Sequence, residues 1–285
     1  MRLIKKRSLH RFLLLAALAA PMQLAFAAEP VVTGTENRGP LLQDWQFSLG
    51  SYFLTNSTKV TVNGETLPGN EVDWENEFDL GDRDQFRLDA FWRFAERHKV
   101  RLMYFQNNRS NTRVTDREID FQGDVYPVNV SVTASLDEKI IELAYEYAFY
   151  KTDKLELAAS GGIHTLKIEP KLSATITGTG GSSTLQTSAA SMTGPLPVLG
   201  FRALWDMGNH FYLDALVQFF YISFDQYSGS ITDGKLAVTW MPWRNVGFGL
   251  GWNSFKTRVD VSKGDFDGKL KFGYGGAMAY VTFAF

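Results

Sequence analysis

Apolar residues recur at every second position in ten separate segments of the chain, and this alternation limits the possible folds more than any other feature. Successive side chains of a β-strand point to opposite faces, so a period of two predicts strands with one apolar and one polar face. Helical spacing of apolar residues is hard to find over any long window. We therefore predict an all-β fold, with strands around residues 45–53, 85–94, 100–104, 141–149, 155–163, 199–205, 213–221, 236–240, 246–252 and 277–285.

Short and long connections alternate between these segments. Residues 95–98, 151–154, 206–209 and 241–245 form short turns, whereas residues 55–84, 110–137 and 169–194 form long loops and two shorter loops lie near 225–230 and 257–265. Tight turns at one end and long loops at the other are typical of a transmembrane barrel, whose closure satisfies every backbone hydrogen bond. The sequence thus predicts an antiparallel up-and-down β-barrel of ten strands, with eight or twelve as the other possible counts.

Two segments leave the strand count open, namely residues 60–74 and 113–132. As additional spanning strands they would raise the count, but we expect them to be strand extensions that stand above the membrane. Val128, Val130 and Val132 alternate well, and their phase then slips near Asp137. We expect a β-bulge to absorb this slip.

Aromatic residues stand next to the short turns, at the end of each descending strand. Amphipathic rings prefer the boundary between lipid headgroups and hydrocarbon, so these positions predict an aromatic girdle at a common depth. The alternative is the core of a soluble β-protein, but such a core normally scatters large aromatic residues along its strands. The expected girdle consists of Trp92, Phe94, Tyr147, Phe149, Trp205, Trp240, Phe283 and Phe285.

Residues 1–27 have the three-part order of a secretory signal: five bases, an apolar run at 12–20, and Ala25-Phe26-Ala27. We predict cleavage after Ala27, which leaves residues 28–285 as the barrel domain. The apolar run is too short for a permanent anchor, which needs about 20 residues. Without this segment 24 bases face 31 acids, and the resulting formal charge of −7 gives no support for a nucleic-acid partner.

The last strand, residues 275–285, ends in Phe and has apolar residues at alternate positions before it. It resembles the closing strand of bacterial outer-membrane β-barrels, and the signal segment and the strand rhythm are similar to theirs. The resemblance identifies a superfamily and no subfamily. It implies integration into the outer membrane of a Gram-negative bacterium, contact with outer-membrane lipid and lipopolysaccharide, and recognition of the strand ending in Phe285 by the barrel-assembly machinery. We expect a monomer.

Charged residues alternate with the apolar face and should point into the barrel. A ten-stranded barrel has little free lumen once side chains fill it, so charges of both signs should pair there rather than line a wide pore. Arg101, for example, could pair with Glu142 or Glu146. Small inward residues such as Gly200 and Gly249 leave space for a narrow water path or a slender ligand. The expected lumen charge network is Arg87, Asp89, Arg93, Arg101, Glu142, Glu146, Glu156, Arg202, Asp214 and Lys235.

Few residues suggest chemistry. His164 points inward on the same face as Ser160, but no acid at close sequence spacing must meet it, as a hydrolase would need. No motif of barrel lipases, lipid A deacylases or omptin-like proteases is recognisable. Asp73, Glu75, Glu77 and Asp79 alternate with other residues, so on one edge of an extended segment they could hold Ca²⁺. Their spacing fits no Ca²⁺ loop, however, and a solvated face is expected. We predict no catalytic, cofactor or metal site.

The sequence thus predicts a non-enzymatic outer-membrane barrel that is structural or a narrow passive channel for small solutes. A first alternative is a barrel that binds ligands or surfaces through its long loops, among which the Ser/Thr/Gly-rich residues 173–193 are expected to be flexible. A second alternative is a barrel enzyme that hydrolyses lipids or peptides.

Overall fold

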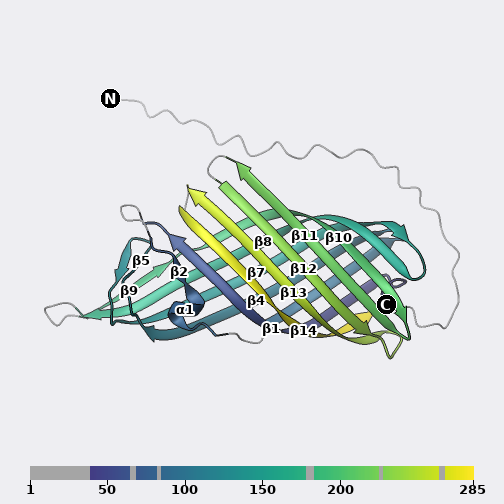
Figure 1. Cartoon of the computed structure of the whole chain (residues 1–285), viewed down its shortest axis with the longest axis horizontal. Coiled ribbons are helices and arrows are strands. Elements are labelled where there is room, and N and C mark those ends of the chain that lie inside the picture. Colours follow the sequence, from purple (N-terminus) through teal and green to yellow (C-terminus); the bar gives the residue numbers. More distant parts are fainter. Residues whose placement is uncertain (1–38, 65–68, 82–84, 178–182, 225–226, 263–266) are drawn as a thin grey trace, which may run out of the picture. The chain divides into compact units, whose positions relative to one another are not determined.

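The computed structural model describes residues 39–64, 69–81, 85–177, 183–224, 227–262 and 267–285. Ten strands form a closed antiparallel ring, shown in Figure 1. The predicted signal segment and its cleavage after Ala27 lie outside the described residues. The ring strands are β1 (Trp45–Val62), β3 (Gln85–Ala95), β4 (His98–Val114), β7 (Ser131–Lys151), β8 (Leu155–Thr177), β10 (Met192–Gly208), β11 (Phe211–Phe224), β12 (Tyr227–Trp240), β13 (Val246–Ser262) and β14 (Asp267–Ala284).

The ring closes between the first and the last strand. β1 pairs with β14 from Gln46 opposite Ala284 to Val62 opposite Gly268. On its other edge β1 pairs with β3, and every further strand pairs with the next strand of the ring. The prediction of a ten-stranded antiparallel barrel is confirmed. Among the described residues, no helix is long and apolar enough to cross a membrane.

The remaining elements lie at the end with the long connections: β2 (Val72–Asp73), α1 (Trp74–Phe78), β5 (Ile119–Phe121), β6 (Asp124–Tyr126) and β9 (Ser183–Ala189). The sequence analysis expected an extended acidic segment where α1 forms, and this was wrong. The Asp73 carboxylate accepts a hydrogen bond from the Asn76 backbone and caps the helix, which ends at Asp79 in the left-handed region at φ 51°. The acidic side chains therefore do not share one edge.

The strands next to the long connections extend well beyond the predicted segments. β1 continues to Val62 and β4 to Val114, so parts of the doubtful segments are strand extensions, as expected. The bulge expected near Asp137 is absent from the described strands, because Asp137 lies in regular register opposite Asn108 and Glu169. Register shifts occur instead next to three short turns.

The apparent phase slip has a different cause. Val132, Leu136 and Ile140 point inward on the same face as Glu138 and Glu142, and all are buried. Along β7 the inner face changes from mostly apolar, with Glu138 as the exception, to charged at Glu142 and Glu146, while the alternation itself continues. The described part of residues 173–193 was also misjudged as a flexible loop, because β9 pairs with β8 from Lys171 opposite Ala189 to Thr177 opposite Ser183.

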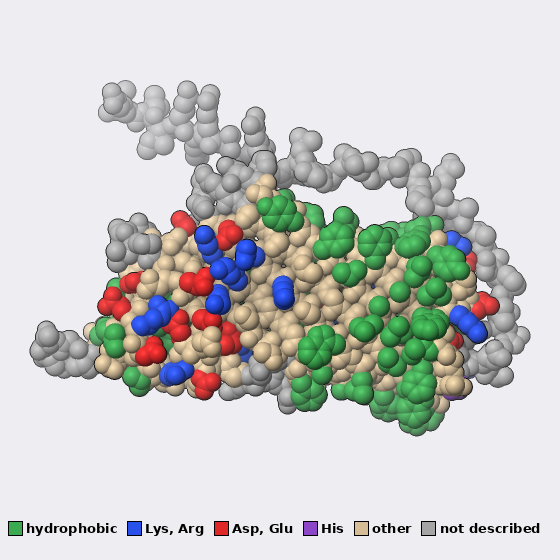
Figure 2. Space-filling view, viewed as in Figure 1, with side chains coloured by type: hydrophobic (Ala, Val, Ile, Leu, Met, Phe, Trp, Pro, Cys, Tyr) green, Lys and Arg blue, Asp and Glu red, His purple; other side chains and the backbone are tan. Residues whose placement is uncertain are grey.

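The outer surface has two zones, which Figure 2 shows from one side. Hydrophobic side chains gather over the end with the short turns, and charged side chains gather toward the end with the long connections. The lumen has the opposite arrangement. Buried charges lie on the short-turn side, whereas a core cluster that includes Phe105, Phe255 and Phe272 fills the lumen on the other side.

Candidate functional site

The buried charges form a continuous chain of ion pairs across the lumen, which we call the ionic layer. On one side, Arg93 of β3 lies 2.7 Å from Glu156 of β8, measured from Nη1 to Oε2. Lys99 of β4 contacts Glu156 as well, and its Nζ lies 3.5 Å from Oε1 of Glu146 on β7. These four side chains are at most 4% exposed. Each cation therefore has a carboxylate partner away from solvent.

The chain continues on the other side of the lumen. Arg202 of β10 lies 3.5 Å from Glu146 and donates from Nε and Nη2 to both carboxylate oxygens of Asp214 on β11, at 2.7 and 3.1 Å. Lys235 of β12 lies 2.9 Å from Asp214. The ion pairs thus connect β3, β8, β4, β7, β10, β11 and β12. Replacing such pairs by separated ions would cost several kcal/mol for each ion left unpaired.

Two further groups lie beside this chain. Arg101 pairs with Glu142, one of the two partners that the sequence offered it. Glu142 also accepts a hydrogen bond from Gln218 at 2.7 Å, and its Oε2 lies 3.2 Å from Nε2 of His164. Glu142 and His164 face each other in register on neighbouring strands. Sequence reasoning looked for an acid near His164 along the chain and could not see this partner.

The second group joins β3 to β13. Arg87 donates from Nε and Nη2 to Asp89 at 2.7 and 2.8 Å, and from Nη1 to Asn253 at 3.1 Å. Asn253 in turn donates to Asp233 at 2.7 Å. The sequence analysis missed Asn253 and Asp233, although Asp233 has the same inward phase as Lys235. All ten residues of the expected lumen charge network are thus in ion pairs.

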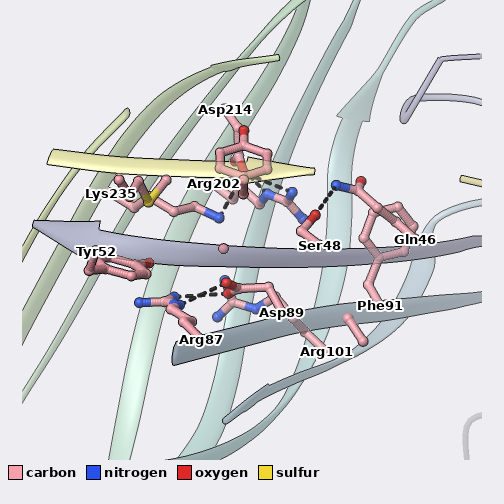
Figure 3. Close-up of a pocket in the computed structure, with 14 residues that line it drawn as sticks. Gln46, Ser48, Tyr52, Arg87, Asp89, Phe91, Arg101, Arg202, Asp214 and Lys235 are labelled. Carbon is pink, nitrogen blue, oxygen red and sulfur yellow. Dashed lines mark hydrogen bonds and ion pairs between the residues drawn. The ribbon is translucent and has the colours of Figure 1, made fainter. Parts of the chain in front are cut away.

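A small cavity lies between the Arg87–Asp89 pair and the Arg202–Asp214–Lys235 part of the ionic layer. Its volume is about 30 Å³, and its lining includes Arg87, Asp89, Arg202, Asp214 and Lys235. Figure 3 shows the Arg87–Asp89 and Arg202–Asp214 pairs projecting toward each other from different strands. A water molecule needs roughly 10 to 15 Å³ of such space, so the cavity has room for about two waters. It is too small to be a passage for a solute.

The inward glycines do not widen the lumen. A Cβ atom on Gly249 would lie 1.9 Å from the ring of Tyr280, and one on Gly200 would lie 2.6 Å from Oγ of Ser160. The space that these glycines leave is therefore occupied by neighbouring side chains. The water path that the sequence allowed beside them does not exist at these two positions.

Beyond the ionic layer the lumen is filled by aromatic rings. The Tyr274 ring stacks on Phe105 and Phe255 with centroid distances of 4.9 and 5.2 Å, and Phe272 lies 6.0 Å from Phe255. These four side chains are at most 3% exposed. We call this region the apolar layer. An ion that entered it would lose most of its hydration.

A cap closes the apolar layer at the long-connection end. Trp74 and Phe78 of α1 are buried and pack against each other, and Trp74 also contacts Phe121 of β5. Arg109 holds the cap in place, because its Nη1 lies 2.7 Å from Glu75 and its Nη2 lies 3.0 Å from Glu138. Sequence reasoning missed Arg109, which lies between the predicted strand at 100–104 and the predicted loop at 110–137, and therefore did not find this partner of Glu138.

The acidic residues of this cap contact basic residues. Glu77 contacts Arg117, and Asp73 lies 3.2 Å from Lys59. A hydrogen bond from Lys271 lowers the pKa of Glu71, and a hydrogen bond to Asp73 raises the pKa of Lys59. No group of three or more metal-ligating side chains is found in the described part of the chain.

The eight residues of the expected aromatic girdle are all exposed on the outer face, from 38% for Tyr147 to 57% for Phe285. Trp45 joins them, since its ring stacks on Trp92 at 5.3 Å, and Phe211 stacks on Trp240 at 6.3 Å. Sequence reasoning missed Trp45 and Phe211 because both begin ascending strands, whereas it considered only the ends of descending ones.

No protein-family model matches the sequence. A search of curated proteins finds no match either. Solved structures do match. The outer-membrane protease OmpT from Escherichia coli aligns with a TM-score of 0.55 at 10% identity, over 85% of this chain and 96% of that chain. The chain has the fold of an outer-membrane β-barrel.

Two other matching barrels have lower scores. The Ail protein of Yersinia pestis has a TM-score of 0.31 at 11% identity, over 82% of this chain and 98% of that chain. The toluene transporter TodX of P. putida has a TM-score of 0.35 at 10% identity, over 85% of this chain and 90% of that chain. The barrel fold shared with OmpT is the one that the resemblance of the last strand implied.

Proposed function

We propose that the protein is a structural outer-membrane barrel with a closed lumen that conducts no solute. The observation that carries this proposal is the ionic layer, which runs from Arg93 to Lys235 through shared carboxylates. A conducting path would have to separate these buried pairs, and each unpaired ion in the interior costs several kcal/mol. It would also have to cross the apolar layer. Of the two roles that the sequence predicted, the geometry favours the structural one over the narrow channel.

Planar-bilayer recording of the refolded mature protein tests this proposal. We expect no conductance above that of the bare membrane in any salt. A general porin inserted into the same kind of membrane is the positive control and should give stepwise increases in current. A heat-modifiability gel run on the same sample shows whether the barrel is folded. Steady unitary steps from folded protein would overturn the closed lumen and support the passive channel.

A second candidate function is recognition of a ligand or surface by the elements beyond the membrane. The observation in its favour is that these elements are paired and tied together. Tyr126 of β6 donates to the carbonyl oxygen of Leu172 at 3.1 Å and lies 2.6 Å from Oγ of Ser188. Leu185 of β9 is 69% exposed. Replacing residues 175–185 by Asn-Gly leaves Ala174 opposite Gln186 and should leave folding unchanged. Lost adhesion or phage binding would support recognition, and unchanged binding would oppose it.

We propose no enzymatic role. His164 is fully buried and its ring stacks on Phe255 at 6.1 Å, so it has no open side for a substrate. Ser160 lies in register with Glu146 and not with His164. Assays of lipid and peptide hydrolysis should give the same background for the natural protein and for His164→Ala. An activity that this substitution abolishes would favour the hydrolase alternative.

Recognition of the strand ending in Phe285 by the barrel-assembly machinery and the monomeric state stay predictions. The first follows from the resemblance of the last strand to those of other outer-membrane barrels, and the second is the default expectation.

A further inference from the structure

A row of cations crosses the outer face of three neighbouring strands. Lys59 of β1 lies directly opposite Lys271 of β14, and Lys271 lies directly opposite Arg258 of β13. Lys256 follows two residues closer to the apolar band, opposite Gly273. Like charges directly opposite each other destabilise a sheet, so this arrangement favours an anion that lies across the row.

The protein's own carboxylates neutralise only one side of the row. Glu71 lies 2.8 Å from Nζ of Lys271 and 3.9 Å from Nζ of Lys59. Within the part of the chain that the structure describes, neither Lys256 nor Arg258 makes an ion pair, and both are exposed. The β13 side of the row therefore keeps its positive charge.

The cations border a groove of about 490 Å³ that also includes Gly273 and Gly275 of β14. The floor at Gly275 is open, because a Cβ there would meet only Asn253 O at 3.9 Å and Ser254 Oγ at 4.0 Å. A bulky ligand could therefore approach the sheet between β1 and β13.

The groove borders the apolar band. Trp252 of β13 lies opposite Ala277 of β14, which lies opposite Phe53 of β1. Trp252 and Phe53 are 57% and 64% exposed, so they stand on either side of the small alanine. Trp252 is four residues from Lys256, about 13 Å along the strand. Figure 2 shows basic side chains gathered beside the apolar band.

We propose that the surface formed by Lys59, Lys256, Arg258, Lys271, Gly273 and Gly275 binds the phosphate-bearing headgroup of lipopolysaccharide, with an acyl chain over Ala277 between Trp252 and Phe53. The long-connection side of an outer-membrane barrel faces the cell exterior, where this lipid lies. Lysine and arginine together suit phosphate, which accepts charge-assisted hydrogen bonds from both. An anionic peptide would use the cations but would not need the apolar neighbours. This inference does not depend on the closed lumen.

The test is a binding titration of the full mature protein in detergent with lipopolysaccharide, followed by native mass spectrometry. Each cation near a lipid surface contributes about 1 kcal/mol, so Lys256→Gln/Arg258→Gln should bind about thirtyfold more weakly. The matched control is Lys139→Gln/Lys167→Gln, which removes two cations of the outer face that also lie opposite each other, on β7 and β8, although Lys167 pairs with Glu169. This control should bind as the natural protein does.

Two further binding measurements distinguish recognition of the phosphate-bearing headgroup from occupation of the groove. Gly275→Leu fills the groove without changing charge and should weaken binding at least tenfold. Dephosphorylated lipopolysaccharide should bind the natural protein as weakly as the intact lipid binds the double variant. A heat-modifiability gel establishes that each variant is folded. Equal affinity of the natural protein and both variants, equal loss in the control, or full competition by an anionic peptide would each overturn the proposal.

Discussion

The two halves of the barrel have opposite arrangements of polar and apolar side chains. Next to the short turns, Trp92 and Leu143 are exposed on the outside while Glu146 and Lys99 are buried inside. Toward the long connections the inside holds Phe255 and its neighbours, and the outside carries charges. The half next to the short turns thus has an apolar outside and a charged inside. The other half has the arrangement of a soluble domain, with an apolar inside and a charged outside.

The solvent explains this difference. In lipid, apolar side chains gain nothing by leaving the surface, so hydrogen bonds and ion pairs must hold the lumen together. In water, the hydrophobic effect favours an apolar interior and contributes about 25 cal/mol for each Å² buried. The boundary between the ionic layer and the apolar layer therefore follows the level at which the membrane ends.

The largest effect is expected in the ionic layer. Glu156→Ala leaves Arg93 and Lys99 without one shared carboxylate, and we expect a loss of about 3 to 5 kcal/mol in the free energy of unfolding. Urea titration of the barrel in lipid vesicles, followed by tryptophan fluorescence, measures this. Glu169→Ala, which breaks an exposed pair with Lys167, should cost less than about 1 kcal/mol. Equal losses would contradict a buried ionic layer.

A somewhat smaller effect is expected in the apolar layer. Ile140 is fully buried in the lumen, so Ile140→Ala should cost about 3 kcal/mol by leaving a cavity. The same urea titration measures the loss. Leu185→Ala, at an exposed position of β9, should stay within about 0.5 kcal/mol. If Ile140→Ala had no effect, the lumen at this level would be hydrated and the comparison would fail.

The cap gives the third prediction. Glu75 binds Arg109 and accepts hydrogen bonds from the backbone and hydroxyl of Thr58, so Glu75→Gln should weaken the cap by about 2 kcal/mol. Hydrogen exchange of residues 69–81 should then accelerate while the membrane strands keep their protection. Asp79→Asn is the control, because asparagine tolerates the left-handed conformation found there. Faster exchange in the control alone would contradict the role given to Glu75.

The smallest effect concerns pH. Lys271 lowers the pKa of Glu71 below its ordinary value of 4.5. This pair contributes stability at pH values above 4.5 and loses it as the pH falls through the lowered pKa. Both side chains are exposed, so the effect should stay below about 1 kcal/mol. Exchange of residues 69–73 between pH 7 and 3 should depend less on pH in Glu71→Gln; an unchanged dependence would show that the pair contributes nothing.

The sequence predicted the lipid-facing half because lipid imposes a simple rule. Outward residues such as Phe86 and Trp92 must be apolar, and the alternation gives their inward neighbours directly. It also placed ten of the charged residues of the lumen on the inner face. The sequence could not assign all the partners of these residues. Glu142 and His164, for example, lie opposite each other only because of the register of β7 against β8, which the alternation alone does not determine.

The half beyond the membrane was harder to predict. Val132, Leu136 and Ile140 looked like a change of phase because the inner face was expected to stay polar along the whole strand. Asp73 looked like part of an extended acidic edge, although an aspartate three residues before a backbone donor is also a helix cap. The same residue types have different roles once the outer solvent is water.

Quenching by brominated lipids tests the central claim most directly, with single-tryptophan variants that keep Trp92, Trp205, Trp240 or Trp74. The first three are 44%, 46% and 45% exposed on the outer face, whereas Trp74 is fully buried in the cap. We expect brominated acyl chains to quench Trp92, Trp205 and Trp240 strongly and to leave Trp74 bright. Quenching of Trp74 to the same degree, or protection of the other three, would contradict a barrel with an apolar outside in lipid and an apolar inside above it.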